Sequence, residues 1–130
     1  AWIKSYQEVY RTPKWTWHFE IEIDGVLYRH KPGVSGAGAA RKACVKHRQS
    51  IAFGHLHGYA GVEYSVNSRD AIFGIGVGCG VDRRARAMAY GKDFEDKPII
   101  GCGTIEDGVH AVFHPMNLGA RYPRTRKAVA

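Results

Sequence analysis

Residues 15–30 carry the pattern that most narrowly restricts the fold of this chain. From Trp15 to Ile23, apolar and polar residues alternate strictly, which is typical of a β-strand with one buried face. The dipeptide Asp24-Gly25 comes next and favours a two-residue hairpin turn, and Val26–His30 returns from it as a second strand. The pattern predicts a β-hairpin with His30 at the end of its second strand.

A helix and another apolar strand follow this hairpin. Small and apolar residues recur at helical spacing from Ala37 to Arg48, and Ser35 is a candidate N-cap. The short apolar segment Ser50–Phe53 then runs directly into Gly54-His55-Leu56-His57-Gly58. Strand, helix and strand in this order predict a crossover whose two strands lie near each other in one sheet. We therefore expect His30 and the His55/His57 pair at the same edge of that sheet.

The rest of the chain has the character of β structure, so we predict an α/β fold with one clear crossover helix. Short strands are expected at residues 61–66, 71–77, 99–105 and 109–113, and residues 79–98 form a charged, irregular excursion. The whole of residues 1–130 fits one domain or one part of a larger core, with a helical lead-in at 1–14 and a basic tail at 118–130.

The composition restricts the possible binding partners and the cellular compartment of the protein. The net charge of +7 favours either a polyanionic partner, such as nucleic acid, or a basic surface with no specific partner. Three cysteines at wide spacing (Cys44, Cys79 and Cys102) match neither a disulfide framework nor a CxxC zinc site, so we expect a reducing, cytoplasmic compartment. No apolar run approaches the roughly 20 residues of a membrane-spanning helix, and we expect no membrane partner.

The histidines of Gly54-His55-Leu56-His57 are the strongest chemical signal. Residues two apart in an extended chain project to the same side, so His55 and His57 can face one site. Neutral imidazole binds zinc, iron, manganese and nickel. Two histidines in a surface turn are the alternative for this motif alone, but His30 at the neighbouring strand end favours a metal site of His30, His55 and His57.

The run from Trp17 to Met116 resembles the C-terminal half of the calcineurin-like metallophosphoesterases, most closely the small members encoded by phages. In that family a strand ends in a metal-binding histidine, a helix follows, and the next strand ends in Gly-His-x-His. The corresponding segments here are His30, the helix at 37–48, Gly54-His55-Leu56-His57, the downstream Gly78-Cys79-Gly80-Val81-Asp82 with the later Tyr90, and the closing His114-Pro115-Met116.

This resemblance implies a β-sandwich flanked by helices and a site for two divalent metal ions (Mn, Zn, Fe or Ni). It implies that His30 and His55 bind one ion and His57 the other, and that the substrate is a phosphomonoester or phosphodiester. Lys31 stands where the family usually has glycine, and we expect its cation near a bound phosphate.

The family's upstream motifs, Asp-x-His, Gly-Asp-x-x-Asp and Gly-Asn-His-Asp/Glu, do not occur in the sequence, so no catalytic residue is assigned to this chain. Two dications about 4 Å apart need anionic bridges to offset their repulsion, and imidazoles are neutral. We therefore expect the C-terminal portion of a phosphoesterase whose carboxylates come from an N-terminal half, in a longer precursor or a partner chain. If phage-encoded, it belongs to the host cytoplasm or the virion.

Three alternatives remain: a defunct site, a non-enzymatic basic virion or nucleic-acid-associated protein that keeps half of the fold, and a mononuclear metal-binding domain. Half of a sandwich would also leave apolar surface exposed, so we expect the isolated chain to oligomerise or bind a partner.

Overall fold

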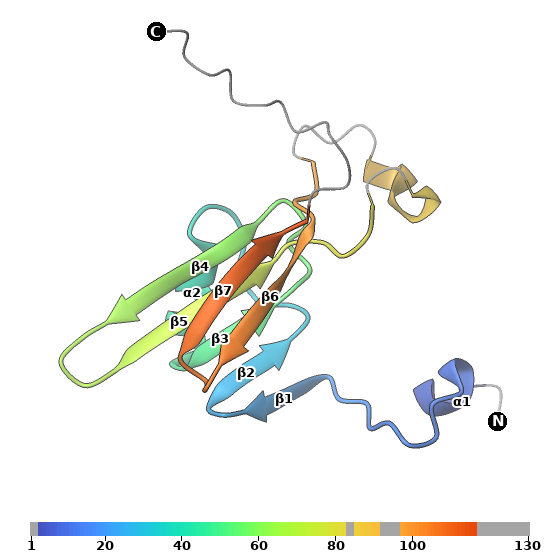
Figure 1. Cartoon of the computed structure of the whole chain (residues 1–130), viewed down its shortest axis with the longest axis horizontal. Coiled ribbons are helices and arrows are strands. Elements are labelled where there is room, and N and C mark those ends of the chain that lie inside the picture. Colours follow the sequence, from blue (N-terminus) through green and yellow to red (C-terminus); the bar gives the residue numbers. More distant parts are fainter. Residues whose placement is uncertain (1–2, 83–84, 92–96, 117–130) are drawn as a thin grey trace, which may run out of the picture.

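A five-stranded mixed sheet lies at the centre of the computed structural model, which describes residues 3–82, 85–91 and 97–116 (Figure 1). The strand order is β1-β2-β3-β5-β4; β2, β3 and β5 run parallel, and β1 and β4 are antiparallel to their neighbours. The strands are β1 (Glu20–Ile23), β2 (Val26–Arg29), β3 (Ser50–Phe53), β4 (Ala60–Val66) and β5 (Ala71–Val77). The predicted α/β class is confirmed at this level.

The predicted hairpin is present, but its first strand is shorter than expected. Asp24 and Gly25 both have positive φ (50° and 73°), as a tight two-residue hairpin turn requires. The prediction that the strand begins at Trp15 is wrong, because β1 begins at Glu20, which pairs with Arg29 at the end of β2. Strand β2 is only four residues long and offers no edge to the residues before Glu20.

The predicted crossover from β2 to β3 is confirmed, with α2 (Ala39–His47) as its helix. Ser35 is not the N-cap as predicted; Gly38 occupies that position, with φ 68° and no side-chain cap. The first helical N–H groups are bonded from β4 and the loop before it instead. The N–H of Ala40 donates to the Tyr59 hydroxyl (3.2 Å) and the N–H of Arg41 to Glu63 Oε2 (3.2 Å).

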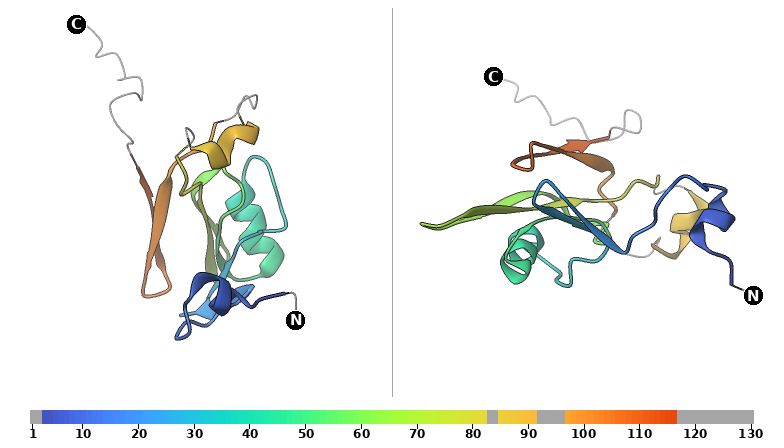
Figure 2. Two further views of the ribbon diagram at one scale, coloured as in Figure 1. Left: turned by 90° about the vertical axis from the view of Figure 1, so that its right-hand side faces the viewer. Right: turned by 90° about the horizontal axis from the view of Figure 1, so that it is seen from below.

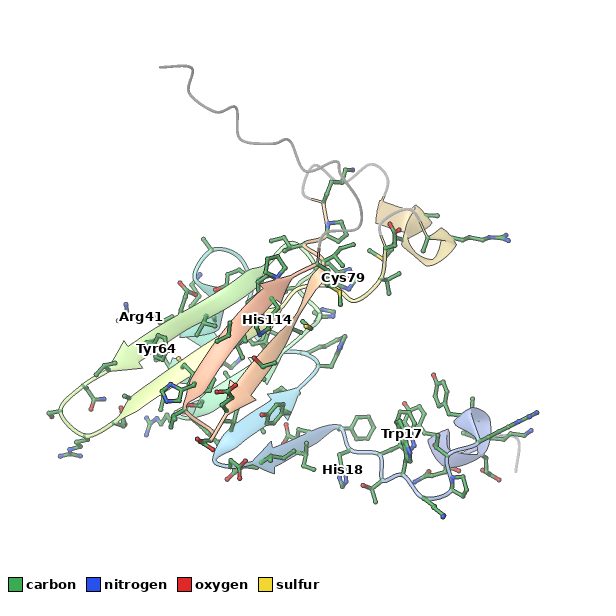
Figure 3. All side chains as sticks on the ribbon, viewed as in Figure 1. Trp17, His18, Arg41, Tyr64, Cys79 and His114 are labelled. Carbon is green, nitrogen blue, oxygen red and sulfur yellow. The ribbon has the colours of Figure 1, made fainter. Side chains whose placement is uncertain are left out.

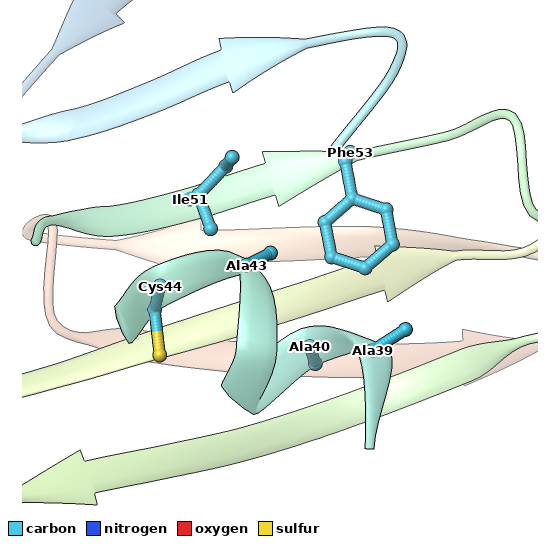
Figure 4. Close-up of a cluster of buried hydrophobic side chains, with 6 residues drawn as sticks. All are labelled: Ala39, Ala40, Ala43, Cys44, Ile51 and Phe53. Atoms are coloured by element: carbon cyan, nitrogen blue, oxygen red, sulfur yellow. The ribbon is translucent and has the colours of Figure 1, made fainter. Parts of the chain in front are cut away.

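Three layers result from this arrangement, with α2 on one face of the sheet and the hairpin of β6 (Gly101–Glu106) and β7 (His110–Pro115) on the other (Figure 2). Between α2 and the sheet, a buried cluster joins helical alanines to the inward side chains of β3 (Figure 4): Ala39, Ala40, Ala43, Cys44, Ile51 and Phe53. A second cluster lies on the hairpin side: Val26, Ala52, Phe73, Ile75 and Ala111. Alternation along β3 therefore buries both faces of the central sheet.

Glycines let these layers approach closely. A Cβ at Gly74 of β5 would lie 2.0 Å from the carbonyl oxygen of Ala40 in α2, and one at Gly103 of β6 would lie 2.8 Å from Ile75 Cδ1. The glycine-rich segment 74–80 covers the end of β5 and the residues after it, and glycine at 74 permits direct helix–strand contact.

The remaining elements are short. The helical lead-in predicted for residues 1–14 contains one brief helix, α1 (Tyr6–Tyr10), and the irregular excursion contains a 3-10 helix, Arg86–Gly91. The four later strands predicted from the sequence correspond to β4 to β7. The basic tail at 118–130 lies outside the described residues. No helix among those described is both long and apolar enough to cross a membrane.

Candidate metal centre

His30 and His55 meet at the carboxyl ends of neighbouring parallel strands. His30 follows β2 directly, and His55 is the second residue after β3. Their rings meet edge to face with centroids 5.1 Å apart, and His55 Nδ1 lies 3.3 Å from His30 Nε2. The β2–α2–β3 crossover therefore brings together two histidines that are far apart in the sequence, as predicted.

The backbone at His55 is in the left-handed region, with φ 67°. This conformation is uncommon for a residue with a side chain and costs roughly 1 kcal/mol, so it indicates a local constraint. A Cβ at the preceding Gly54 would stand 3.6 Å from His30 Nδ1, so the chain passes close beside the His30 ring. Strand end, glycine and left-handed histidine together hold one imidazole against the other.

The environment keeps the His55 ring neutral. Partial desolvation lowers the pKa of His55, and the positive charges of Lys31, His30 and His57 lower it further. A neutral imidazole has a free nitrogen lone pair, which is the form that binds a metal ion. The electrostatics of the pair therefore favour ligand chemistry at neutral pH.

The spacing of the two nitrogens fits shared coordination of one ion. Two nitrogen ligands at about 2.1 Å from a tetrahedral ion lie roughly 3.4 Å from each other. The Nδ1–Nε2 separation of His55 and His30 is 3.3 Å, close to that value. Imidazole donors suit zinc, iron, manganese and nickel, which are the ions expected from the sequence.

The third predicted ligand, His57, lies near this pair without completing a three-ligand group. Its charge contributes to the lowered pKa of His55, and its carbonyl accepts a hydrogen bond from the N–H of Ile99 (2.8 Å). Among the residues that the structure describes, no three His, Cys, Asp or Glu side chains form a group that could hold an ion. The extended geometry that would point His55 and His57 to one side is interrupted by the left-handed backbone at His55.

A groove of about 560 Å³ lies between the sheet and β6, and His30 is among the residues that line it. The β6–β7 hairpin contacts mainly β4 and β5, and it covers the same face of β1 to β3 less completely: Val26 and Ala52 are buried there, whereas Ile21 of β1 is exposed. The groove is lined largely by apolar groups from both layers, with Glu20, Arg29 and His30 among its polar residues and Tyr28, Ile75 and Ile105 among the others. A volume of this size is within the range of ligand-binding clefts. The groove residue Tyr28 was not predicted; its signal is its place two residues before His30 on one strand, which puts both side chains on the same face.

The remaining residues named from the sequence, and the further histidine His47, each have contacts of their own. Lys31 is exposed, and its charge acts on His55. Cys79 is buried, and its Sγ accepts a hydrogen bond from the N–H of Val81 (3.4 Å). His114 Nε2 lies 2.8 Å from Thr104 Oγ1 across the β6–β7 pair, and His47 Nε2 lies 3.2 Å from the carbonyl of Pro32. The last two histidines thus have structural hydrogen bonds of their own.

The Tyr59–Glu63 pair beside α2 has no local signal in the sequence. The Tyr59 hydroxyl donates to Glu63 Oε2 (2.5 Å), and both groups also accept N–H bonds from the start of the helix. The hydrogen bond from Tyr59 is the main reason that the pKa of Glu63 is lowered, and burial raises the pKa of Tyr59 to about 12. The pair positions the crossover helix that links His30 to His55.

Comparison with protein-family models, with curated proteins and with solved structures gives no match for this chain.

Proposed function

We propose that this chain supplies the imidazole ligands of a two-metal phosphoesterase, with His30 and His55 on one ion and His57 on the other. The observation that carries this proposal is the 3.3 Å approach of His55 Nδ1 to His30 Nε2 at the ends of parallel strands. The resemblance of residues 17–116 to calcineurin-like metallophosphoesterases supplies the reaction class. Bound ions of this kind lower the pKa of a water and stabilise charge on phosphoryl oxygens.

The residues of this chain hold and surround the ions in this proposal. Two parallel strands fix His30 and His55, and desolvation together with the neighbouring positive charges lowers the pKa of His55, which favours its neutral form. Lys31 is exposed beside the pair, and its positive charge attracts the phosphate group of the substrate. The chain thus provides metal ligands and electrostatic attraction for a phosphoester.

Carboxylates from a partner chain or a longer precursor complete the centre. Imidazoles carry no charge to offset two dications, so the ions need anionic bridges from elsewhere. The open groove beside His30 gives the segment that carries these carboxylates a place to lie, next to an apolar sheet face that needs cover. We therefore expect the active species to contain more than the residues of this chain.

Metal titration of the purified chain tests the ligand assignment. Zn²⁺ or Mn²⁺ binding is measured by calorimetry for the wild type and for His55→Ala, with His110→Ala as control, because His110 is exposed on the β6–β7 hairpin. Loss of a direct ligand is expected to weaken binding by at least about tenfold, as loss of outer-shell partners already does. Equal affinities of His55→Ala and His110→Ala would refute the assignment.

Hydrolysis tests the reaction class separately. All chains that co-purify with this one are identified, and the assembly is assayed with p-nitrophenyl phosphate and its bis ester before and after chelation. Two ions per assembly and chelator-sensitive hydrolysis are expected. One ion per chain, together with no hydrolysis by an assembly that contains carboxylate motifs, would instead identify a mononuclear metal-binding protein.

A further inference from the structure

The segment of residues 3–17, named here the aromatic arm, gathers four aromatic rings beyond the start of β1. The rings of Tyr10 and Trp17 are stacked, with centroids 5.1 Å apart and planes 19° apart. Tyr6 and Trp15 flank Trp17 with centroid distances of 5.3 and 6.3 Å. Figure 3 shows Trp17 beside α1, at the end of the molecule away from the free end of β4. The rings form one contiguous cluster.

Local hydrogen bonds hold this cluster in shape without help from the sheet. Ser5 and Glu8 form a reciprocal capping box at the start of α1, and Arg11 ends the helix with a left-handed backbone, φ 54°. Trp17 Nε1 donates to Thr12 Oγ1 over 3.2 Å. The rings are therefore preorganised, which reduces the entropy lost when a ligand binds.

The rings are exposed although they are large and mainly apolar. The exposed fraction is 54% for Tyr6, 61% for Tyr10, 65% for Trp15 and 39% for Trp17. Contiguous exposed aromatic surface of this kind usually marks a binding site. Each ring still has area free for a flat partner.

Cations are interleaved with the rings. Lys4, Arg11 and Lys14 are exposed, lie within two positions of an aromatic residue, and form no ion pair with any residue that the structure describes. Glu8 is the arm's one acidic residue in the sequence, and it is bound to Ser5 in the capping box. Three cations less one carboxylate leave the arm with a net charge of +2. Its charge thus complements a polyanion.

We propose that the aromatic arm binds single-stranded nucleic acid, with bases stacked on Trp15 and the Tyr10–Trp17 pair and phosphates beside the three cations. Stacking platforms among basic residues are how proteins bind single strands without reading sequence. An anionic membrane attracts the same residue types, but it is bound through a longer amphipathic helix, and α1 has five residues. The proposal is independent of the metal centre, because it uses none of the same residues.

Intrinsic tryptophan fluorescence reports on the first 17 residues, because the three tryptophans of the chain are Trp2, Trp15 and Trp17, and the last two belong to the aromatic arm. Titration with a short oligo(dT) is expected to quench the emission. With three cations at phosphates, log K should fall with log salt at a slope of about −2. Quenching that is absent, or equally strong with duplex DNA of the same length, would overturn the proposal.

Two single substitutions and a matched control locate the site. Trp15→Ala removes the most exposed ring of the cluster and is expected to weaken oligo(dT) binding by at least about fivefold. Lys14→Ala is expected to reduce the salt slope by about 0.7. Tyr64→Ala on β4 removes another exposed aromatic ring, distant from the arm in Figure 3, and is expected to leave binding unchanged.

Two further outcomes would assign the rings to another partner and refute nucleic-acid binding. A blue shift of the tryptophan emission with anionic lipid vesicles, without a response to oligo(dT), would identify a membrane surface. An emission change that follows protein concentration alone would show that a second copy of the chain covers the rings. Circular dichroism of each variant checks that the fold is intact, as expected, since no residue of α1 is buried.

Discussion

Replacement of Gly74 by alanine is the most direct test of how the crossover helix lies on the sheet. A Cβ at this position would be 2.0 Å from the carbonyl oxygen and 2.5 Å from the carbonyl carbon of Ala40. Separations under 3.0 Å essentially do not occur for real Cβ atoms, so α2 and β5 must separate by roughly 1 Å. Both groups belong to the backbone, and no side-chain rotation can relieve the contact.

The cost follows from the surfaces that this separation opens. Ala39, Ala40, Ala43 and Cys44 are all fully buried between α2 and the sheet. A gap of 0.5–1 Å removes about a quarter to a half of the attraction across such a contact. Overpacking of a core usually costs about 1–3 kcal/mol. A backbone clash that cannot be relieved belongs at the upper end of this range. We therefore expect the free energy of unfolding, which is about 5–15 kcal/mol for a typical protein, to fall by about 3 kcal/mol.

Urea unfolding followed by far-UV circular dichroism measures this loss, with Gly80→Ala as the control. A Cβ at Gly80 meets no atom within 4 Å, and that backbone has no positive φ in the range that disfavours side chains. We expect Gly80→Ala to remain within about 0.5 kcal/mol of the wild type, and Gly74→Ala to unfold roughly 10 °C lower on heating. If the two variants were equally stable, the close packing of α2 on β5 would be wrong.

Three further predictions concern titratable groups. Glu63→Gln is expected to cost about 1 kcal/mol of stability near pH 7 through the weakened helix-start bonds. Hydrogen bonding lowers the pKa of Glu63, so its carboxylate contributes to stability above the ordinary pKa of 4.5, and this contribution disappears as pH falls below that value. The free energies of unfolding of the variant and the wild type, measured by urea titration, should therefore converge in acid. Cys102 is exposed and should react with a thiol reagent at once. Cys44 is buried, which raises its pKa, and it should react only when the protein unfolds. Equal reaction rates of the two thiols would contradict the fold. His55 should titrate in NMR below the ordinary 6.5, and Lys31→Ala should raise its pKa; an unchanged value would remove Lys31 from the site. Since folding favours neutral His55, the stability of the wild type should fall as pH drops through 6.5.

The parts of the fold that could be predicted have local signals. Asp24-Gly25 specifies a turn in which both residues have positive φ, and that turn is observed. The crossover could be predicted because a helical pattern stands between two apolar strands, and parallel strands require such a connection. The same reasoning placed His30 and His55 at one sheet edge.

Other features depend on distant partners and left no local signal. Alternation from Trp15 to Phe19 suits a strand, but β2 is too short to pair with it, and the tryptophans pack with Tyr10 and Tyr6 instead. The start of α2 is fixed by Tyr59 and Glu63, about twenty residues later in the chain. A sequence pattern cannot show which partner is available in space.

The geometry of the candidate centre could not be predicted from the sequence either. The motif His55-Leu56-His57 predicts two imidazoles on one side only if the chain stays extended. The left-handed backbone of His55 interrupts that conformation and turns this ring toward His30. A single dihedral angle therefore decides which pair of histidines is in contact.

The candidate centre and the core depend on the same crossover, which limits how the site can change independently. His30 and His55 stand one and two residues past strands whose buried side chains include Val26, Ile51 and Phe53. Any change that shifts α2 moves these strand ends, so core substitutions near α2 alter both stability and the nitrogen spacing. Within the part of the chain that the structure describes, the aromatic arm has no such link, because its ring contacts and side-chain hydrogen bonds are among its own residues. Substitutions in the arm therefore separate nucleic-acid binding from metal binding, whereas substitutions in the core cannot.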